Sequence, residues 1–359
     1  MNEALVRKLL LEQYKRYPKM QIQDMVKLIF QSEFAGGHLI QSEEDSLRRL
    51  QAEFESLSFN EGHQSPLLFE EIGNGLCRLN LRALKDSDIN LRTVNRFFVC
   101  TANQAAGSIQ SFEAELDIFR KCCRDKELPY LPGEVEAYLL HYKNQGFPAV
   151  SHSASFRAHY QPAYRIVKSG HVKYFKVFCE IDALLKTHES INLAIDGNSG
   201  AGKSSLAAFI NEIYDGNIFH MDDFFLRPEL KTESRMKEVG GNVDYVRFKE
   251  EVVAGLKTGR EFQYRIYDCR RRTLGNSIRV VPKKLNIIEG SYSMHPTLAD
   301  YYNLKIFLRI DAKEQSRRIL QRNGPVMHRS FIEEWIPKEN QYFDRLKIED
   351  QCDFVFINN

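Results

Sequence analysis

The segment IDGNSGAGKSS, residues 195–205, contains the spacing G-x-x-x-x-G-K-S, which runs from Gly197 to Ser204. Glycines in such a loop let backbone N–H groups surround phosphate oxygens, where a Cβ atom would obstruct them. The lysine would bridge the β- and γ-phosphates, and the serine hydroxyl would be a ligand of Mg²⁺. We therefore expect this loop to bind ATP together with Mg²⁺. The expected nucleotide-binding residues are Gly197, Asn198, Ser199, Gly200, Ala201, Gly202, Lys203, Ser204 and Ser205.

The residues around the loop provide the context that this motif requires. The apolar run INLAI (191–195) predicts a buried strand, and SSLAAFINEIY (204–214) has the apolar spacing of a helix. The motif does not identify a reaction, because GTPase switches, motor ATPases and small-molecule kinases share it. The chain has neither the N-K-x-D motif of G proteins nor the L-S-G-G-Q motif of ABC-type ATPases. A kinase would need a further group, a base near the γ-phosphate that accepts the proton of the acceptor hydroxyl.

Two carboxylates that follow later strands would supply such chemistry. In HMDDFF (220–225), Asp222 follows the strand NIFHM, which we expect to lie beside the strand that precedes the phosphate loop. Asp222 would act as the base and help to hold Mg²⁺, and Phe224 would wall the acceptor pocket. Glu289, at the end of the run LNIIE, would orient Mg²⁺ and its waters. A helix-capping role for either carboxylate is the alternative.

The chain divides into parts of different texture. Residues 1–165 contain stretches with apolar side chains at helical spacing, such as QIQDMVKLIF, and predict a mostly α-helical domain. In residues 188–359, short runs rich in Ile, Val and Phe alternate with helix-like stretches. This alternation predicts an α/β fold, a P-loop NTPase parallel sheet with helices on both faces. Residues 166–187 would form a linking helix, whose helical pattern HVKYFKVFCEIDALLKTH (171–188) follows the breaks at Pro162 and KSG (168–170).

The amino-acid composition indicates which classes of partner and which cellular compartment to expect. The 359 residues are 43% hydrophobic and 27% charged, with a formal net charge of +2, which is typical of a globular protein without a general attraction to nucleic acid or membranes. No apolar run approaches the ~20 residues of a membrane span. Seven scattered cysteines without a C-x-x-C pair fit a reducing cytosol. We expect a cytoplasmic protein whose partner is a small-molecule acceptor, with no nucleic acid and no membrane. Whether it forms a homo-oligomer stays open.

From about residue 188 to 359, just under half of the chain resembles the uridine kinase and phosphoribulokinase family of P-loop kinases. The order of features carries the resemblance: GNSGAGKSS, MDDFF, GGNVDYVRF, YRIYD, IIEG, LKIFLRIDAKEQSRRILQR and CDFVFI. The resemblance implies that Asp222 is the catalytic aspartate, that Asp244 binds the acceptor ribose and that Tyr267 contacts the nucleobase. It also implies that arginines of a mobile lid, here Arg317 and Arg318, gather around the transferred phosphate.

Two departures bear on the acceptor. The segment YDCRRRT places Arg272 where the family has a base-reading histidine, and NVDYVRF lacks the proline and second aspartate of the family's NFDHPDAF-like segment. The resemblance implies phosphoryl transfer to a hydroxyl group of a small molecule, with a nucleoside as the expected acceptor. Another hydroxylated or anionic metabolite is the alternative, since Arg265 and the arginines at 270–272 could bind an anion or form a solvated surface.

A protein of another class, a nucleotide-dependent switch without catalysis, is the second hypothesis. Asp222, Glu289 and the lid arginines favour the enzyme, because a switch needs no base on the acceptor side. In the helical half, the run SHSASFRAHYQPAYR (151–165) mixes hydroxyls, arginines and tyrosines as a small anion pocket would, although a structural or dimerisation role fits equally. The histidines of this half lack a compact metal-ligand spacing. Its role stays open.

Overall fold

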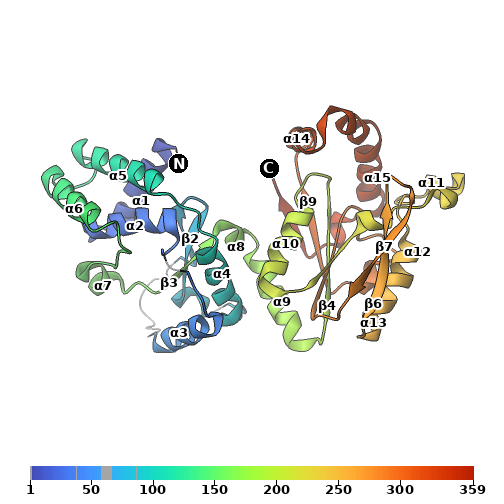
Figure 1. Ribbon diagram of the computed structural model, residues 1–359, viewed down its shortest axis with the longest axis horizontal. Coiled ribbons are helices and arrows are strands. Elements are labelled where there is room, and N and C mark those ends of the chain that lie inside the picture. Colours follow the sequence, from blue (N-terminus) through green and yellow to red (C-terminus); the bar gives the residue numbers. More distant parts are fainter. Residues whose placement is uncertain (1, 38, 58–66, 86) are drawn as a thin grey trace. The chain divides into compact units, whose positions relative to one another are not determined.

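The computed structural model describes residues 2–37, 39–57, 67–85 and 87–359. The chain forms two compact units, Met1–Cys179 and Glu180–Asn359, and the boundary between them falls inside helix α9 (Phe175–Thr187). Figure 1 labels the helices and strands of both units. Each unit has a buried apolar core of its own. None of the helices that the structure describes combines the length and the apolarity that a membrane crossing requires.

The N-terminal unit is mostly helical, as predicted. Helix α2 buries Met25, Val26 and Ile29, the side chains that follow the helical period, and α5 adds Phe112 and Phe119 to the same core. The helices are α1 (Glu3–Arg16), α2 (Ile22–Phe34), α3 (Glu43–Ser56), α4 (Leu91–Asn103), α5 (Ile109–Arg124), α6 (Pro132–Asn144), α7 (Ala154–Tyr160) and α8 (Ser169–Lys173).

This unit also contains an antiparallel sheet that the sequence analysis did not predict. Its strands are β1 (Phe69–Gly73), β2 (Leu76–Asn80) and β3 (Tyr164–Lys168), in the order β1-β2-β3. Asn74 and Gly75 connect β1 to β2 with φ values of 49° and 71°. Two successive residues with positive φ form the tight turn that Asn-Gly pairs favour in hairpins. The residues GNG, which interrupt the helical pattern in the sequence, thus form a hairpin turn.

The linking helix expected over residues 166–187 is only partly present, and this expectation is corrected at its start. Residues 166–168 belong to strand β3, where Val167 pairs with Cys77 of β2. A backbone in such a ladder has its N–H and C=O groups engaged with the neighbouring strand, so it cannot make helical hydrogen bonds. Helices α8 and α9 follow.

The C-terminal unit is built on a five-stranded parallel sheet, which confirms the predicted α/β fold (Figure 1). The strands lie in the order β10-β9-β4-β8-β5, so the strand that leads into the phosphate loop is central. The side chains of the three central strands are largely buried, as expected for a sheet covered on both faces. The strands are β4 (Ile191–Gly197), β5 (Asn217–His220), β8 (Leu285–Glu289), β9 (Leu304–Arg309) and β10 (Phe354–Ile357).

One expectation about the order of strands is wrong. Strand β5, which precedes Asp222, lies at the edge of the sheet, and β8 separates it from β4. The order of strands depends on the crossover connections, which local sequence does not encode. The remaining elements of this unit are α10 (Lys203–Tyr214), α11 (Glu233–Lys237), α12 (Tyr245–Phe248), α13 (Ala254–Thr258), the hairpin of β6 (Phe262–Asp268) and β7 (Thr273–Val280), α14 (Ala312–Ser330) and α15 (Ile336–Leu346).

Candidate phosphoryl-transfer site

The phosphate loop connects the end of β4 to the start of α10, as the sequence predicts. Gly197 has a φ of 134°, and a Cβ atom there would lie 2.1 Å from the carbonyl oxygen of Leu308 in β9, so only glycine fits. Gly200 and Gly202 also have positive φ values, 78° and 95°. Helix α10 begins at Lys203, which places its positive N-terminal end at the loop. This geometry is that of an anion-binding turn.

Lys203 lies folded over the loop. Its ammonium group donates hydrogen bonds to the carbonyl oxygens of Gly197 (2.8 Å) and Asn198 (3.0 Å) and to the hydroxyl of Ser291 (3.2 Å). The side chain is thus held at the phosphate loop by neutral acceptors. These are weaker partners than a phosphate oxygen would be, because hydrogen bonds between charged groups are stronger.

The carboxyl ends of three neighbouring strands bring the predicted site residues together. Glu289, at the end of β8, pairs with Ile195 of β4 on one side and with His220 of β5 on the other. Since parallel strands end at the same edge, the phosphate loop after β4, Glu289 and the turn that contains Asp222 are neighbours. The predicted grouping of these residues is therefore present, although the order of the strands differs from the expectation.

The hydroxyl of Ser204 and the carboxylate of Glu289 form a candidate Mg²⁺ site. Ser204 Oγ donates to Glu289 Oε1 at 3.0 Å, and His220 Nδ1 contacts the same oxygen. This contact raises the pKa of His220. Oxygen ligands suit Mg²⁺, which takes one or two carboxylates and completes its shell with water and phosphate oxygens. Within the described ranges no cluster of three His, Cys, Asp or Glu side chains could hold a metal ion unaided, so these residues fit a Mg²⁺ that arrives with a nucleotide.

Asp222 lies in a 3-10 turn, Met221–Phe224, that follows β5 directly. The side chain is open to solvent, yet the surrounding protein removes part of its hydration and raises the pKa of the carboxyl group, and the charges of Glu289 and Glu339 raise it further. No hydrogen-bond donor contacts this carboxylate among the residues that the structure covers. A carboxylate with available lone pairs and a raised pKa is suited to accept a proton.

The predicted acceptor residues Asp244 and Phe224 are both buried. Asp244 is 4% exposed and caps α12 by accepting the backbone N–H of Arg247 at 3.1 Å, whereas its Oδ2 atom has no hydrogen-bond partner in the described part of the chain. Phe224 is 0% exposed and packs against Phe248 and Tyr264. The expectation that Phe224 walls an open pocket is therefore wrong, because its apolar ring completes the core beneath the turn instead.

The sequence analysis did not identify Arg247, which supports the turn that contains Asp222. Its guanidinium group donates to the carbonyl oxygens of Asp223 (2.7 Å) and Arg265 (2.5 Å), and it lies 4.2 Å from the centre of the Phe224 ring. The Nε atom is buried and makes no hydrogen bond within the described residues, but it lies 3.6 Å from Asp244 Oδ2, with which it forms an ion pair. Arg247 thereby connects the turn, α12 and strand β6. The one signal in the sequence is that an arginine replaces the family's residues in NVDYVRF.

The other two predicted acceptor residues lie in the β6–β7 hairpin. Tyr267 is buried, and it pairs with Leu274 across the hairpin. Arg272 is exposed at the tip and has a φ of 55°. Part of the neighbouring positive charge is already paired, since Arg265 bonds Glu251 at 3.0 Å and Arg271 lies 3.8 Å from Asp268. The hairpin thus presents Arg272 to solvent and keeps Tyr267 inside.

The predicted lid arginines lie on α14, where both pair with Glu314. Arg317 and Arg318 donate to its carboxylate at 2.6 and 2.7 Å, and together they lower the pKa of Glu314 to about 2. Arg318 also reaches the phosphate loop, where its Nη1 atom lies 3.4 Å from the carbonyl oxygen of Gly200. The structure therefore places Arg318 at the loop, while Arg317 stays on the exposed face of the helix.

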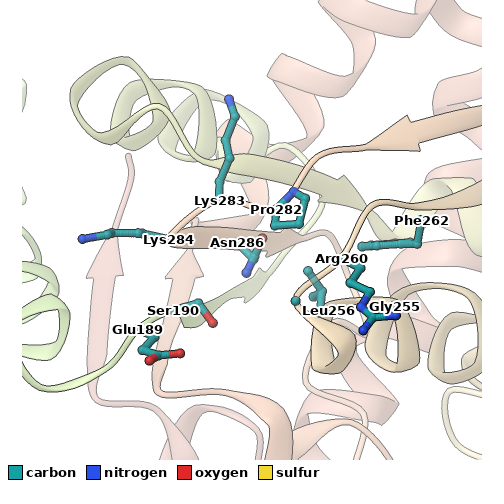
Figure 2. Close-up of a pocket in the computed structure, with 11 residues that line it drawn as sticks. Glu189, Ser190, Gly255, Leu256, Arg260, Phe262, Pro282, Lys283, Lys284 and Asn286 are labelled. Carbon is teal, nitrogen blue, oxygen red and sulfur yellow. The ribbon is translucent and has the colours of Figure 1, made fainter.

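A separate cavity of about 340 Å³ lies near the amino ends of strands β4 and β8, away from the phosphate loop (Figure 2). Its lining includes Ser190 and Lys284, which directly precede strands β4 and β8, together with Arg260 and Lys283. The phosphate loop follows the other end of β4. None of the predicted site residues lines this cavity.

Comparison with known proteins identifies similar folds but no sequence family. No family model matches the chain, and no curated protein sequence matches it. The C-terminal half is similar to solved P-loop kinases. One is described as a possible uridine kinase from Bacillus stearothermophilus, at 19% identity over 50% of this chain and 99% of that chain, with a TM-score of 0.38. Another is the shikimate kinase from Acinetobacter baumannii, at 18% identity over 50% of this chain and 88% of that chain, with a TM-score of 0.27.

Proposed function

We propose that this protein transfers the γ-phosphoryl group of ATP to a hydroxyl group of a small molecule. One observation carries the proposal: three features meet where the strands of a parallel sheet end. They are a phosphate loop, a Ser204–Glu289 pair suited to Mg²⁺, and the carboxylate of Asp222, which receives no hydrogen bond from the described residues. A nucleotide switch requires the first two features, but it does not require the third.

The proposed reaction uses these groups in named roles. The loop N–H groups and Lys203 hold the phosphates, and the ammonium group exchanges its carbonyl partners for phosphate oxygens. Asp222 accepts the proton of the acceptor hydroxyl, whose oxygen attacks the γ-phosphorus in line, and ADP leaves. Arg318 approaches from α14 and stabilises negative charge on the moving phosphoryl group. Bound Mg²⁺ would neutralise charge on the β- and γ-phosphates.

We propose a nucleoside as the acceptor. The resemblance of the segments around Asp222 and Asp244 to the uridine kinase family supports this choice. The buried Asp244 Oδ2 atom also supports it, because it accepts no hydrogen bond within the described part of the chain and has only an ion pair with Arg247 Nε at 3.6 Å. A ribose hydroxyl would supply the missing donor, and a buried polar atom gains from such a bond. The departures at Arg272 leave the identity of the base open.

The test measures ADP release by the purified protein with Mg-ATP and one candidate acceptor at a time. The acceptors are nucleosides, sugar phosphates, and hydroxylated metabolites that carry no phosphate. A Lys203→Ala variant, purified in the same way, controls for contaminating kinases. We expect one nucleoside to raise ADP release well above the background of ATP alone, and this increase to disappear in the variant. If only sugar phosphates raise ADP release, the acceptor is an anionic metabolite and not a nucleoside. If no acceptor raises ADP release although ATP binds, the protein is a nucleotide-dependent switch.

A further inference from the structure

Helix α15 contacts the phosphate loop through a buried carboxylate, Glu339, which the sequence analysis did not identify. Glu339 is 5% exposed. Its Oε2 atom accepts the backbone N–H of Ser199 at 3.0 Å, and its Oε1 atom accepts the hydroxyls of Ser199 (2.5 Å) and Ser291 (2.8 Å). Three donors around one carboxylate stabilise its charge away from bulk water, and they fix its position. The loop residue Ser199 is therefore tied to a helix 140 positions away.

A second side chain of the same helix reaches the base of the loop. Tyr342 is one turn after Glu339 and therefore on the same face of α15. Its hydroxyl donates to Asp196 Oδ2 at 2.9 Å, and Asp196 is the residue before the first glycine of the loop. Asp196 is 0% exposed and also accepts the backbone N–H of Gly197 at 2.7 Å. Helix α15 thus holds the loop at two points, Asp196 and Ser199.

The contact extends from Glu339 to the ammonium group of Lys203. Ser291 donates its hydroxyl to Glu339, and the same oxygen accepts from Lys203 at 3.2 Å. A single hydroxyl that donates to a carboxylate and accepts from an ammonium group has its orientation set by both. The position of Glu339 therefore influences where Lys203 lies. Helix α14 adds a contact on the other side of the loop, where Gln315 donates to the carbonyl oxygen of Ser199 at 3.0 Å.

We propose that Glu339 is a positioning residue for the nucleotide phosphates. It holds Ser199 and, through Ser291, Lys203 in the arrangement that receives the β-phosphate, and it connects the loop to helix α15. This inference rests on nucleotide binding, which is part of the proposed function. It assigns Glu339 no contact with the reacting atoms.

The test compares binding of MgADP and of AMP, because AMP lacks the β-phosphate that the loop and Lys203 would hold. Binding is measured by titration calorimetry for MgADP and by displacement for AMP, on the wild-type protein and on Glu339→Gln. We expect the substitution to weaken MgADP binding about tenfold, which is the size of a lost hydrogen bond to a charged group. AMP binding should change less than about twofold. Glu334→Gln is the matched control, since Glu334 is an exposed carboxylate just before α15 that forms a surface pair with Lys338.

A double-mutant cycle separates positioning from a general loss of structure. If Glu339 acts through Ser291, the effects of Glu339→Gln and Ser291→Ala on MgADP binding should not add. Equal weakening of AMP and MgADP, together with a lower melting temperature, would mean that Glu339 only supports the fold and would overturn the proposal. Unchanged or tighter MgADP binding in Glu339→Gln would overturn it as well. A wild-type protein that binds MgADP but turns over no acceptor would refute the proposed reaction, and the titrations would still decide the role of Glu339.

Discussion

Buried charged groups are satisfied differently in the two units. In the N-terminal unit, Asp24 is 0% exposed and accepts four hydrogen bonds, from the backbone N–H groups of Gln21 (3.0 Å) and Ser153 (2.9 Å), the hydroxyl of Ser153 (2.6 Å) and His152 Nδ1 (3.0 Å). His152 in turn contacts the hydroxyl of Tyr164 at 2.6 Å. Every one of these partners belongs to the unit itself.

Arg78 extends this pattern in the N-terminal unit. It is 3% exposed, donates to Gln31 Oε1 at 2.9 Å, lies 3.4 Å from Glu70 and stacks over the ring of Tyr164. The run of residues 151–165, which the sequence presents as a small anion pocket or a structural segment, contributes His152, Ser153 and Tyr164 to this buried network. Its polar groups hold helices and strands together.

At the candidate site of the C-terminal unit, by contrast, several charged groups keep part of their hydrogen-bonding capacity unused. Lys203 rests on neutral carbonyl oxygens, and Asp222 receives no hydrogen bond from the described residues. Asp244 Oδ2 is buried and accepts no hydrogen bond from them either, although Arg247 Nε lies 3.6 Å away as an ion-pair partner. Partners inside the protein stabilise a fold, whereas unused hydrogen-bonding capacity at one edge of a sheet is suited to a ligand. The comparison indicates which polar clusters in this chain serve structure and which serve chemistry.

The largest effect should come from breaking the satisfied network. We expect Asp24→Ala to lower the free energy of unfolding of the N-terminal unit by about 3–5 kcal/mol, since it leaves several buried donors without an acceptor. MgADP binding by the other unit should be retained. Urea unfolding checks the first result, with Asp117→Ala as the control, because Asp117 forms a surface pair with Arg120. A stability equal to that of the control would show that the network contributes little.

The pH dependence of stability should differ in sign between the units. Burial lowers the pKa of His152 to about 4, so stability that is complete above its ordinary pKa of 6.5 is lost as the pH falls. From pH 7 to pH 5 we expect His152 alone to lower the free energy of unfolding of the N-terminal unit by about 2 kcal/mol. Burial raises the pKa of Asp196 to about 6, from 3.8, so protonation of Asp196 should add about 1 kcal/mol to the C-terminal unit over the same range.

Unfolding in urea at pH 7 and pH 5, followed separately in each unit, checks both signs. The only tryptophan, Trp335, reports on the C-terminal unit by fluorescence, and hydrogen exchange of peptides reports on the N-terminal unit. His171, whose pKa burial lowers to about 3, should act in the same direction as His152. A His152→Gln variant should lose about half of the pH dependence in the N-terminal unit, because His171 contributes a similar amount. The same pH dependence in both units would contradict the comparison.

A smaller effect should come from the buried oxygen of Asp244. In Asp244→Asn, an amide group replaces the carboxylate, whose Oδ2 atom accepts no hydrogen bond from the described residues and pairs with Arg247 at 3.6 Å. We expect the KM for the acceptor to rise about tenfold, the size of one lost hydrogen bond to a charged group, with the KM for ATP unchanged. Steady-state kinetics with each substrate varied in turn checks this split. Equal changes in both KM values would place Asp244 in the support of the fold.

The parts of the site that were predictable from the sequence are local in the chain. The phosphate loop lies within nine residues between a strand and a helix, and Asp222 and Glu289 each follow an apolar run, so position along the sequence indicates position at the sheet edge. The α/β fold followed from the alternation of apolar runs and helical patterns. The insertion of β8 between β4 and β5 was not predictable, because it depends on how the crossovers pack.

The residues that were missed act across long separations. Glu339 meets Ser199 over 140 positions and His152 meets Asp24 over 128, and neither pair leaves a pattern in the sequence. Phe224 was misassigned because an aromatic residue beside a catalytic turn fits a pocket wall and a core position equally well. The antiparallel sheet of the N-terminal unit joins β2 to β3 across more than eighty residues, and the helical patterns between them masked it.

The central claim is that Asp222, rather than its neighbour Asp223, accepts the proton of the acceptor hydroxyl. Burial raises the pKa of Asp223 as well, but the Tyr264 hydroxyl opposes this shift, and the backbone carbonyl of Asp223 accepts Arg247 at 2.7 Å. The most direct test is the single-turnover rate of phosphoryl transfer to the identified acceptor in the matched variants Asp222→Asn and Asp223→Asn. We predict a loss of about 10²-fold or more in the first and less than about tenfold in the second. Equal losses, or a wild-type rate in Asp222→Asn, would contradict the account.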